Sequence, residues 1–458
     1  MTNEVEKPTL LIWLKESIGF KLAFIGALVL MLLIPSVMIQ QLITERAARR
    51  DEVISNISYN FAGKQLVKGP VLVIPYKDQI EVPDGTGKTH LQQIERKLFL
   101  LPDQLSIKAD LKTDVIHKGM FSAVVYKTQV KLSGNFAKAN LGGLGITAEQ
   151  LLPAKAFVTF SVSDLKGLKT NPTLSLGSQT FAAAPSAGNE AAFTNGLQAM
   201  VTNAGDIATS SLPFNCTLDL NGTDGLSFLQ LGKTTDVELS GNWGSPNFDG
   251  RFLPDTRQVK QKDFSARWHV LYYNRPFPQE WTDSASVMNN AGKQQNATFG
   301  VNLRLPVDDY QETTRTNKYA ILIIMLTFVS LFLTELICKK RIHVFNYLLI
   351  GAAMIVFYTL LLSFSEQIGF NWAYLVASIA TIGLITTFLA SLLKNRVTTA
   401  AFASILSTFY AFIYIIIQLE DFALLAGSIA LFVIVAVLMY FSRKINWDGA
   451  DYKPSEAN

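Results

Sequence analysis

The sequence contains few of the residues that build metal, redox or catalytic sites. Its 458 residues include two cysteines and four histidines, and neither CxxC spacing nor an HExxH motif occurs. P-loop, GxGxxG and GxSxG patterns are missing as well. Zinc sites need clustered cysteine or histidine ligands, and phosphate loops and nucleophile elbows need those glycine motifs. The sequence therefore indicates no catalytic residue, no metal ligand and no cofactor, and we expect a protein that is not an enzyme.

Charge is scarce too. Charged residues make up 17% of the chain and hydrophobic residues 49%, whereas soluble domains have roughly 25% charged residues. This balance is typical of an integral membrane protein, whose first partner is the lipid bilayer. The net charge of +4, from 40 basic and 36 acidic residues, is too small to indicate a nucleic-acid partner.

Long apolar runs dominate two parts of the chain. A helix needs about 20 apolar residues to cross a bilayer, and six stretches qualify: 21–43, 319–337, 342–364, 370–393, 398–417 and 421–441. The first is too long for the core of a signal peptide and no cleavage motif follows it, so we interpret it as an uncleaved signal anchor. The sequence thus predicts an α-helical membrane protein with six spans in a one-plus-five arrangement.

Lysine and arginine predict the orientation of these spans. Eleven of them lie in segments 1–21, 338–341, 394–397 and 442–458, and none lies in the short loops near 365–369 and 418–421. Short cytoplasmic loops carry the positive excess, while long loops cross regardless of charge. We therefore expect a cytoplasmic N-terminus (1–20), a cytoplasmic tail (442–458) and residues 44–318 in the periplasm. This topology separates Cys216 from Cys338, which excludes a disulfide between them.

Residues 44–318 have a different pattern. Short alternating runs such as VLVIPY (71–76) and ARWHVLYY (266–273) recur between Gly, Asn, Asp and Pro. This pattern is typical of an all-β, sandwich-like domain. Residues 44–66 continue the first span as a helical stalk, and 188–203 is a second candidate helix.

An internal similarity leaves two interpretations open. The run VKLSGNF (130–136) returns as VELSGNW (237–243) at an offset of 107 residues. Such turns recur by chance in β proteins, or they mark two tandem β modules at about 67–170 and 205–310.

Two carboxylates near the predicted membrane boundaries are candidate functional residues. Ionisable groups inside a bilayer are costly and often mark ion pathways. Glu335 lies in the last turn of the second span, where it can pair with Lys339. Glu366 follows a span that already fills the membrane thickness, so we expect it in a turn (365–369) at the outer surface. For both residues we favour a structural role.

Several stretches, in order and spacing, resemble the CreD family, also called cell envelope integrity proteins. They are LLIPSVMIQQLITERAARR (32–50), KGPVLVIPY (68–76), FSVSDLKGL (160–168), NWGSPNFDGRFLP (242–254), DDYQETTRTNKYAILIIMLTF (308–328), YLLIGAAMIVFYTLLLSFSEQIGF (347–370) and NWD (446–448). The resemblance implies a protein of the Gram-negative inner membrane, associated with envelope integrity, colicin tolerance and responses to β-lactams. It brings no agreed catalytic residue, ligand or cofactor.

We therefore expect a non-enzymatic envelope protein whose periplasmic domain binds an unknown envelope protein or another envelope component. The alternative is a transporter or lipid-handling protein that uses a groove between the helix bundle and the β domain. A polar cavity around Glu335 or Glu366 would favour transport.

Overall fold

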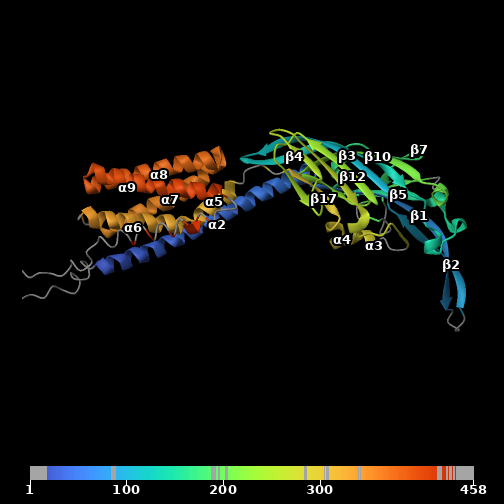
Figure 1. Cartoon of the computed structure of the whole chain (residues 1–458), viewed down its shortest axis with the longest axis horizontal. Helices are drawn as coiled ribbons and strands as arrows, with labels where there is room; N and C mark the ends of the chain where they lie inside the picture. Colours follow the sequence, from blue (N-terminus) through green and yellow to red (C-terminus); the bar gives the residue numbers. More distant parts are fainter. Residues whose placement is uncertain are drawn as a thin grey trace, which may run out of the picture. The chain divides into compact units, whose positions relative to one another are not determined.

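The computed structural model describes residues 18–83, 89–186, 192–193, 196–201, 205–282, 286–303, 305, 309–338, 340, 342–419, 425, 427–429, 432, 436 and 439. The chain divides into two compact units. One unit, which we call the helical unit, combines Met1–Arg49 with Asp308–Asn458. The other, Arg50–Val307, is called the β domain. Figure 1 labels helices and strands of both units.

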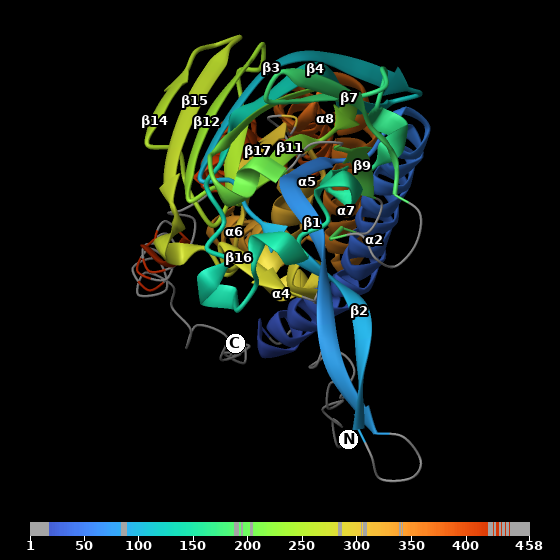
Figure 2. The same cartoon turned by 90° about the vertical axis from the view of Figure 1, so that its right-hand side faces the viewer.

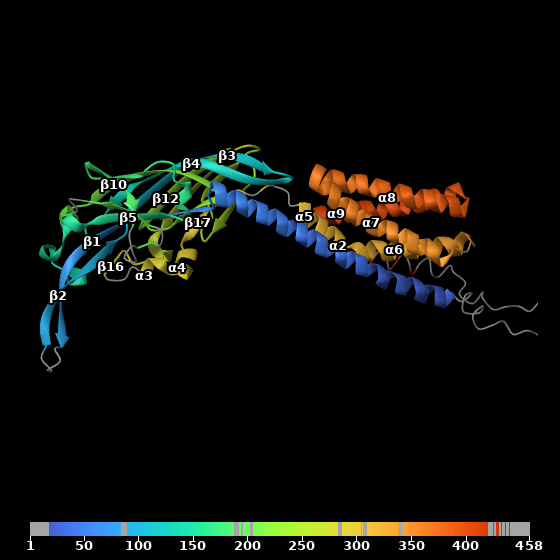
Figure 3. The same ribbon diagram turned by 180° about the vertical axis from the view of Figure 1, so that it is seen from behind.

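Five helices are long and apolar enough to cross a membrane. They are α2 (Ile18–Phe61), α6 (Ala320–Cys338), α7 (Val344–Ile368), α8 (Phe370–Leu393) and α9 (Arg396–Gln418). Figure 3 shows α6, α7, α8 and α9 side by side. Most of the sixth predicted span, 421–441, lies outside the described residues, and those described, 425, 427–429, 432, 436 and 439, are helical. The prediction of a helical membrane part is confirmed.

The turn between α7 and α8 is tighter than the sequence suggests. Helix α7 continues to Ile368, so the prediction that Glu366 lies in the turn is wrong, although the predicted hairpin is present with its turn at Gly369. Gly369 alone joins the two helices, with φ +77°, and its amide donates to the carbonyl of Ser365 at 3.1 Å. Glycine adopts positive φ without steric cost. The polar residues just before Gly369 therefore belong to helix α7 and not to a loop.

A polar helix, α5 (Asp309–Lys318), precedes α6 and belongs to the helical unit. Its buried threonines, Thr313 and Thr316, donate to the carbonyls four residues earlier at 2.6 and 2.8 Å. Asn317 donates to the Ser36 carbonyl of α2 at 3.1 Å. Buried polar groups are tolerated when they are hydrogen-bonded, which explains why this segment packs among apolar helices.

The β domain is a sandwich of two sheets. The nine-stranded sheet follows the order β13-β17-β11-β1-β5-β9-β8, with β2 on β1 and β16 on β2. Its strands are β1 (Gln65–Pro83), β2 (Thr89–Leu100), β5 (Phe157–Val162), β8 (Ala184–Pro185), β9 (Gly196–Met200), β11 (Gly225–Leu229), β13 (Pro246–Gly250), β16 (Glu280–Thr282) and β17 (Thr298–Leu303). Strand β9 shows that the helix considered for 188–203 is wrong over its described residues.

The eight-stranded sheet follows the order β14-β15-β12-β3-β4-β10-β6-β7. Its strands are β3 (Gln104–Lys118), β4 (Phe121–Phe136), β6 (Thr173–Leu176), β7 (Gln179–Ala182), β10 (Leu212–Thr223), β12 (Thr234–Gly241), β14 (Thr256–Val259) and β15 (Phe264–Leu271). Figure 2 shows β3 and β4 in one layer, and β1 and β11 in the other. Buried residues of both sheets form one hydrophobic core. The predicted sandwich is confirmed.

The interpretation as two tandem β modules is wrong. Strands from both predicted intervals share both sheets, because β1 pairs in parallel with β11 and β3 with β12. Parallel pairing needs a long crossover, which no local sequence pattern reveals. The two similar runs fall in β4 and β12, which are separated by β3. The domain is therefore one interleaved sandwich.

The hairpin of β3 and β4 determines which side chains of the eight-stranded sheet lie opposite one another. Lys118 pairs with Phe121 across the two-residue loop Gly119-Met120. Gly119 has φ +63°, and glycine at the first loop position is typical of a type II′ turn. This turn fixes the register along the whole hairpin.

Candidate functional site

Glu335 connects three helices of the helical unit. It is 8% exposed, forms an ion pair with Lys21 of α2 and accepts a hydrogen bond from the Tyr347 hydroxyl of α7 at 3.0 Å. Lys21 also donates to the Ile342 carbonyl at 2.9 Å. The predicted partner Lys339 lies outside the described residues. These contacts are those of a helix-packing residue.

Glu366 joins α7 to α5. The Tyr310 hydroxyl donates to its carboxylate at 2.9 Å, and the side chain is half-buried. Close by in sequence, the Phe370 amide donates to Asp309 at 2.9 Å. Glu366 is 19 residues along α7 from Tyr347, or about 28 Å of helix at 1.5 Å per residue. The structure does not bring Glu335 and Glu366 together, and neither lines the groove between α8 and α9.

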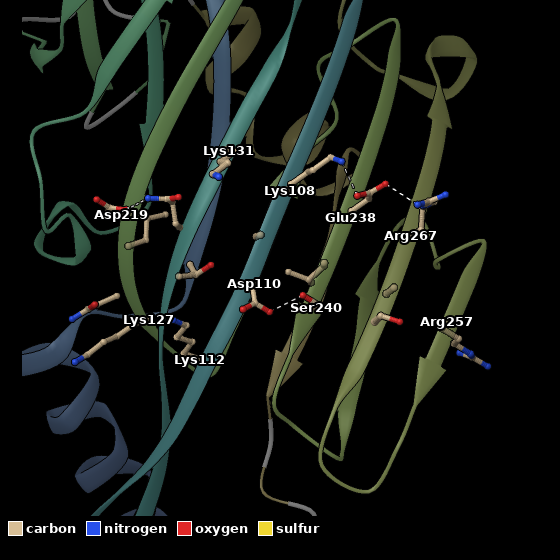
Figure 4. A pocket seen from close by; sticks show the side chains of 18 of the residues that line it. Lys108, Asp110, Lys112, Lys127, Lys131, Asp219, Glu238, Ser240, Arg257 and Arg267 are labelled. Carbon is tan, nitrogen blue, oxygen red and sulfur yellow. Dashed lines mark hydrogen bonds and ion pairs between the residues drawn. The ribbon is translucent and has the colours of Figure 1, made fainter.

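A set of charged side chains lies on the solvent-facing side of the eight-stranded sheet, around a concave site with a volume of about 960 Å³ (Figure 4). We call this concave surface, with the residues that line it, the basic sheet face. Its cations are Lys108, Lys112, Lys127, Lys131, Lys169, Arg257 and Arg267, and its anions are Asp110, Asp219 and Glu238. Seven cations minus three anions leave +4 on this surface.

Strand alternation places these charges outside. Along β3 the apolar residues Ile107, Ala109 and Leu111 are buried in the core, whereas Lys108 and Lys112 between and after them are exposed. Successive side chains of a strand point to opposite faces. The same alternation along the neighbouring strands collects polar side chains into rows that run across the sheet.

The first row contains an ion-pair network. Glu238 lies opposite both Lys108 and Arg267 and contacts them at 3.0 and 2.7 Å. The hydrogen bond from Lys108 is the main reason why the pKa of Glu238 is below its ordinary value, and the charges of Lys108 and Arg267 add to it. Lys131 lies opposite Lys108 on the other side. Among the described residues no carboxylate forms an ion pair with Lys131.

The middle row carries hydrogen-bonding groups. Asp110 accepts a hydrogen bond from the Ser240 hydroxyl at 2.7 Å. Asp219 accepts from the amide of Gln129 and the hydroxyl of Thr170, both at 2.9 Å. These carboxylates are held by neutral partners, and among the described residues no ion pair joins either of them to a lysine.

In the third row Lys112 lies directly opposite Lys127. Within the described parts of the chain, neither forms an ion pair. Side chains directly opposite in an antiparallel pair have Cβ atoms about 4.5–5.5 Å apart, and like charges there are destabilising. The opposed Lys112 and Lys127 therefore carry a cost that an anionic ligand would remove, whereas in the pair of Lys108 with Lys131 Glu238 already compensates Lys108.

His269 lies on the same side of the sheet but does not line the concave surface. Its ring is 2.7 Å from Asp236, and the hydrogen bond and charge of this carboxylate raise the pKa of His269. The side chain is 55% exposed. An exposed His–Asp pair offers no enclosed site for a reaction. Among the described residues no group of three His, Cys, Asp or Glu side chains is arranged to hold a metal ion.

The basic sheet face is not among the sites predicted from the sequence. One signal for it exists: Lys108 and Lys131 are equally distant from the Gly119-Met120 loop, and so are Lys112 and Lys127. Residues equally distant from a two-residue hairpin loop lie directly opposite each other on the two strands. Arg267 and Glu238 reach this face through the pairing of β12 with β15 and β3, which no local sequence pattern predicts.

The comparisons with known proteins agree on one family. The family model described as inner membrane protein CreD matches residues 17–448. A relative from Escherichia coli (strain K12), also named inner membrane protein CreD, is 30% identical over 438 residues, which is 95% of this chain and 94% of the relative. With five apolar helices in the structure, these matches indicate a multi-pass protein of the inner membrane. The chain belongs to the CreD family of inner-membrane proteins.

Proposed function

We propose that the protein is a non-enzymatic inner-membrane protein that supports envelope integrity under stress, including exposure to β-lactams and colicins, by binding an anionic envelope component through the basic sheet face. In this proposal both termini are cytoplasmic and the β domain lies in the periplasm, as the distribution of lysine and arginine in the short loops indicates. One observation carries the proposal. Two pairs of lysines lie opposite each other on a concave surface whose net charge is +4.

Concentrated charge of one sign supports binding in two ways. A concave surface lined by cations focuses its electrostatic field and speeds the encounter with anions. An anion placed between opposed lysines also removes their mutual repulsion. Exposed charges are screened by salt, with a Debye length near 8 Å at physiological ionic strength. Binding through this face should therefore weaken as salt rises.

The test uses the full chain in nanodiscs of zwitterionic lipid. Its binding to purified lipopolysaccharide and to phosphatidylglycerol vesicles is measured at increasing salt. We expect binding to at least one probe, weakened by salt and lost in the variant Lys108→Gln/Lys112→Gln/Lys127→Gln/Lys131→Gln. The control Lys118→Gln/Lys138→Gln changes exposed lysines outside the concave surface. Absent binding, or equal loss per lysine in the control, would overturn the proposal.

One observation favours lipid handling as a second function. A groove of about 540 Å³ lies between α8 and α9. The hydroxyl group of Tyr410, which lines it, is buried without a hydrogen-bond partner among the described residues. Filling the groove by Ser407→Trp should lower the amount of lipid that copurifies, whereas Leu384→Trp, an exposed position of α8 outside the groove, should not.

A further inference from the structure

The two opposed lysine pairs have a defined separation. Lys112 follows Lys108 by four residues on β3, and Lys127 precedes Lys131 by four residues on β4. At a rise of about 3.3 Å per residue, the two pairs are about 13 Å apart along the strands. An even spacing also keeps both pairs on the same face of the sheet. The face therefore presents two cationic points at a fixed distance.

The two points carry similar charge. At one end Lys108, Lys131 and Arg267 face the single carboxylate of Glu238, which leaves +2. At the other end Lys112 and Lys127 give +2. A phosphate monoester carries −1.5 to −2 at neutral pH, so one phosphate can neutralise one pair. A carboxylate has half that charge and would leave one lysine of each pair uncompensated.

Neutral and acidic hydrogen-bonding groups lie between the two points. The middle row consists of Asp110, Asp219, Gln129 and Ser240. A carboxylate has about four acceptor sites, an amide both donates and accepts, and a hydroxyl does likewise. Such a set suits the hydroxyl groups of sugars, which also both donate and accept. A purely polyanionic chain would instead be repelled by Asp110 at the centre.

The size of the concave surface is consistent with a ligand of this kind. Its volume of about 960 Å³ lies near the upper end of the range of about 300–1,000 Å³ for small-molecule sites. Two linked pyranose rings with a phosphate ester at each end span the distance between the lysine pairs.

We propose that the basic sheet face binds the headgroup of a glycolipid that carries two phosphates on a disaccharide. One phosphate lies between Lys108 and Lys131, the other lies between Lys112 and Lys127, and the sugar hydroxyls contact Asp110 and Gln129. This inference rests on the proposed function and names its ligand class. It requires that the protein recognise two phosphates at a fixed separation, whereas a general attraction to anions has no such requirement.

The test compares three lipids with the full chain in zwitterionic nanodiscs. Diphosphoryl lipid A, monophosphoryl lipid A and phosphatidylglycerol are presented at equal density in phosphatidylcholine vesicles. A lipid with one phosphate makes two fewer charge-assisted contacts with the lysines. We therefore expect diphosphoryl lipid A to bind roughly tenfold tighter than either other lipid. Lys112→Gln/Lys127→Gln should abolish this preference, and Lys118→Gln/Lys138→Gln should preserve it.

The outcomes separate the two proposals. Equal binding of all three lipids overturns the two-phosphate inference and leaves the proposed function intact. No binding of any lipid overturns both. Loss of preference in the control variant overturns the assignment to this face. The variant Lys108→Gln/Lys131→Gln tests the other end independently, and circular dichroism verifies that each variant is folded.

Discussion

The hydroxyl group of Tyr347 donates a hydrogen bond of 3.0 Å to Glu335, and the same carboxylate forms an ion pair with Lys21. Through this one residue α6 is connected to both α2 and α7. The ammonium group of Lys21 lies 5.6 Å from the ring centroid of Tyr347, which adds a cation–π contact. Each of the three side chains therefore contacts the other two.

Glu335→Gln should therefore destabilise the helical unit. The amide can still accept from Tyr347, but Lys21 loses its counter-charge in a partly buried position. Breaking a fully buried pair costs about 3–5 kcal/mol, and partial exposure reduces this to roughly 1–3 kcal/mol. Unfolding in mixed detergent measures the loss. The reversed pair Lys21→Glu/Glu335→Lys should recover part of it, and no recovery would contradict the ion-pair account.

Glu366→Gln should leave envelope function and assembly unchanged. Its carboxylate accepts one hydrogen bond, from the neutral hydroxyl of Tyr310, and an amide oxygen can accept the same bond. A net hydrogen bond is worth about 0.5–1.5 kcal/mol, so Tyr310→Phe should cost about that much. Survival under β-lactam or colicin stress is measured beside protein level. Lost function at normal expression would show that Glu366 is more than a packing residue.

Lys127→Gln should stabilise the β domain while weakening anion binding. It removes the repulsion from Lys112 across the ladder, and cross-strand pairs are worth roughly 0.2–1 kcal/mol. Urea unfolding followed by tryptophan fluorescence checks the sign. Lys118→Gln is the matched control, because its cross-strand neighbour is Phe121 and no such gain is expected. A destabilised Lys127→Gln would show that the opposed lysines are compensated.

Stability should depend on pH through Glu238. Because its folded pKa is depressed by Lys108 and Arg267, the unfolded chain binds more protons as pH falls. The contribution of this carboxylate is present above its unfolded pKa of 4.5 and is lost as pH falls through the folded pKa. The difference in unfolding free energy between wild type and Glu238→Gln should shrink at acid pH. A constant difference would refute the ion-pair network.

His269 should act in the opposite direction. Asp236 raises its folded pKa above 6.5, so its contribution is complete below 6.5 and is lost as pH rises through the folded value. His269→Gln should therefore resemble wild type more closely at about pH 9 than at about pH 5.5. An NMR titration of the ring protons gives the pKa directly. A value at or below the ordinary one would exclude the Asp236 contact in solution.

The membrane helices were predictable because their signal is local. The run 370–393 is apolar over the length that a bilayer requires, and α8 occupies Phe370–Leu393. The position of Glu366 was predicted wrongly, because a polar residue near the end of a span is typical of a loop. In the structure Glu366 stays in the helix and accepts a hydrogen bond from Tyr310. The ion-pair partner of Glu335, Lys21, lies 314 residues away, and sequence spacing suggested only the neighbour at i+4.

The basic sheet face was predictable in part. Alternation placed Lys108 and Lys112 outside, and the hairpin loop brought Lys131 and Lys127 opposite them. The pairing of Glu238 with Lys108 joins strands 130 residues apart. Such a pairing depends on packing of the whole core rather than on any local preference, so composition and spacing contain no trace of it.

The parallel pairs β1–β11 and β3–β12 also impose a waiting time on the newly made chain. The neighbour of Gln104 is Thr234, and that of Gln65 is Leu226. At about 5–20 residues per second, the ribosome needs on the order of ten seconds to supply these partners. During this interval β1 and β3 each have one open edge, the kind of edge that pairs with wrong chains. Biogenesis of this protein therefore includes a period in which its most central strands need protection.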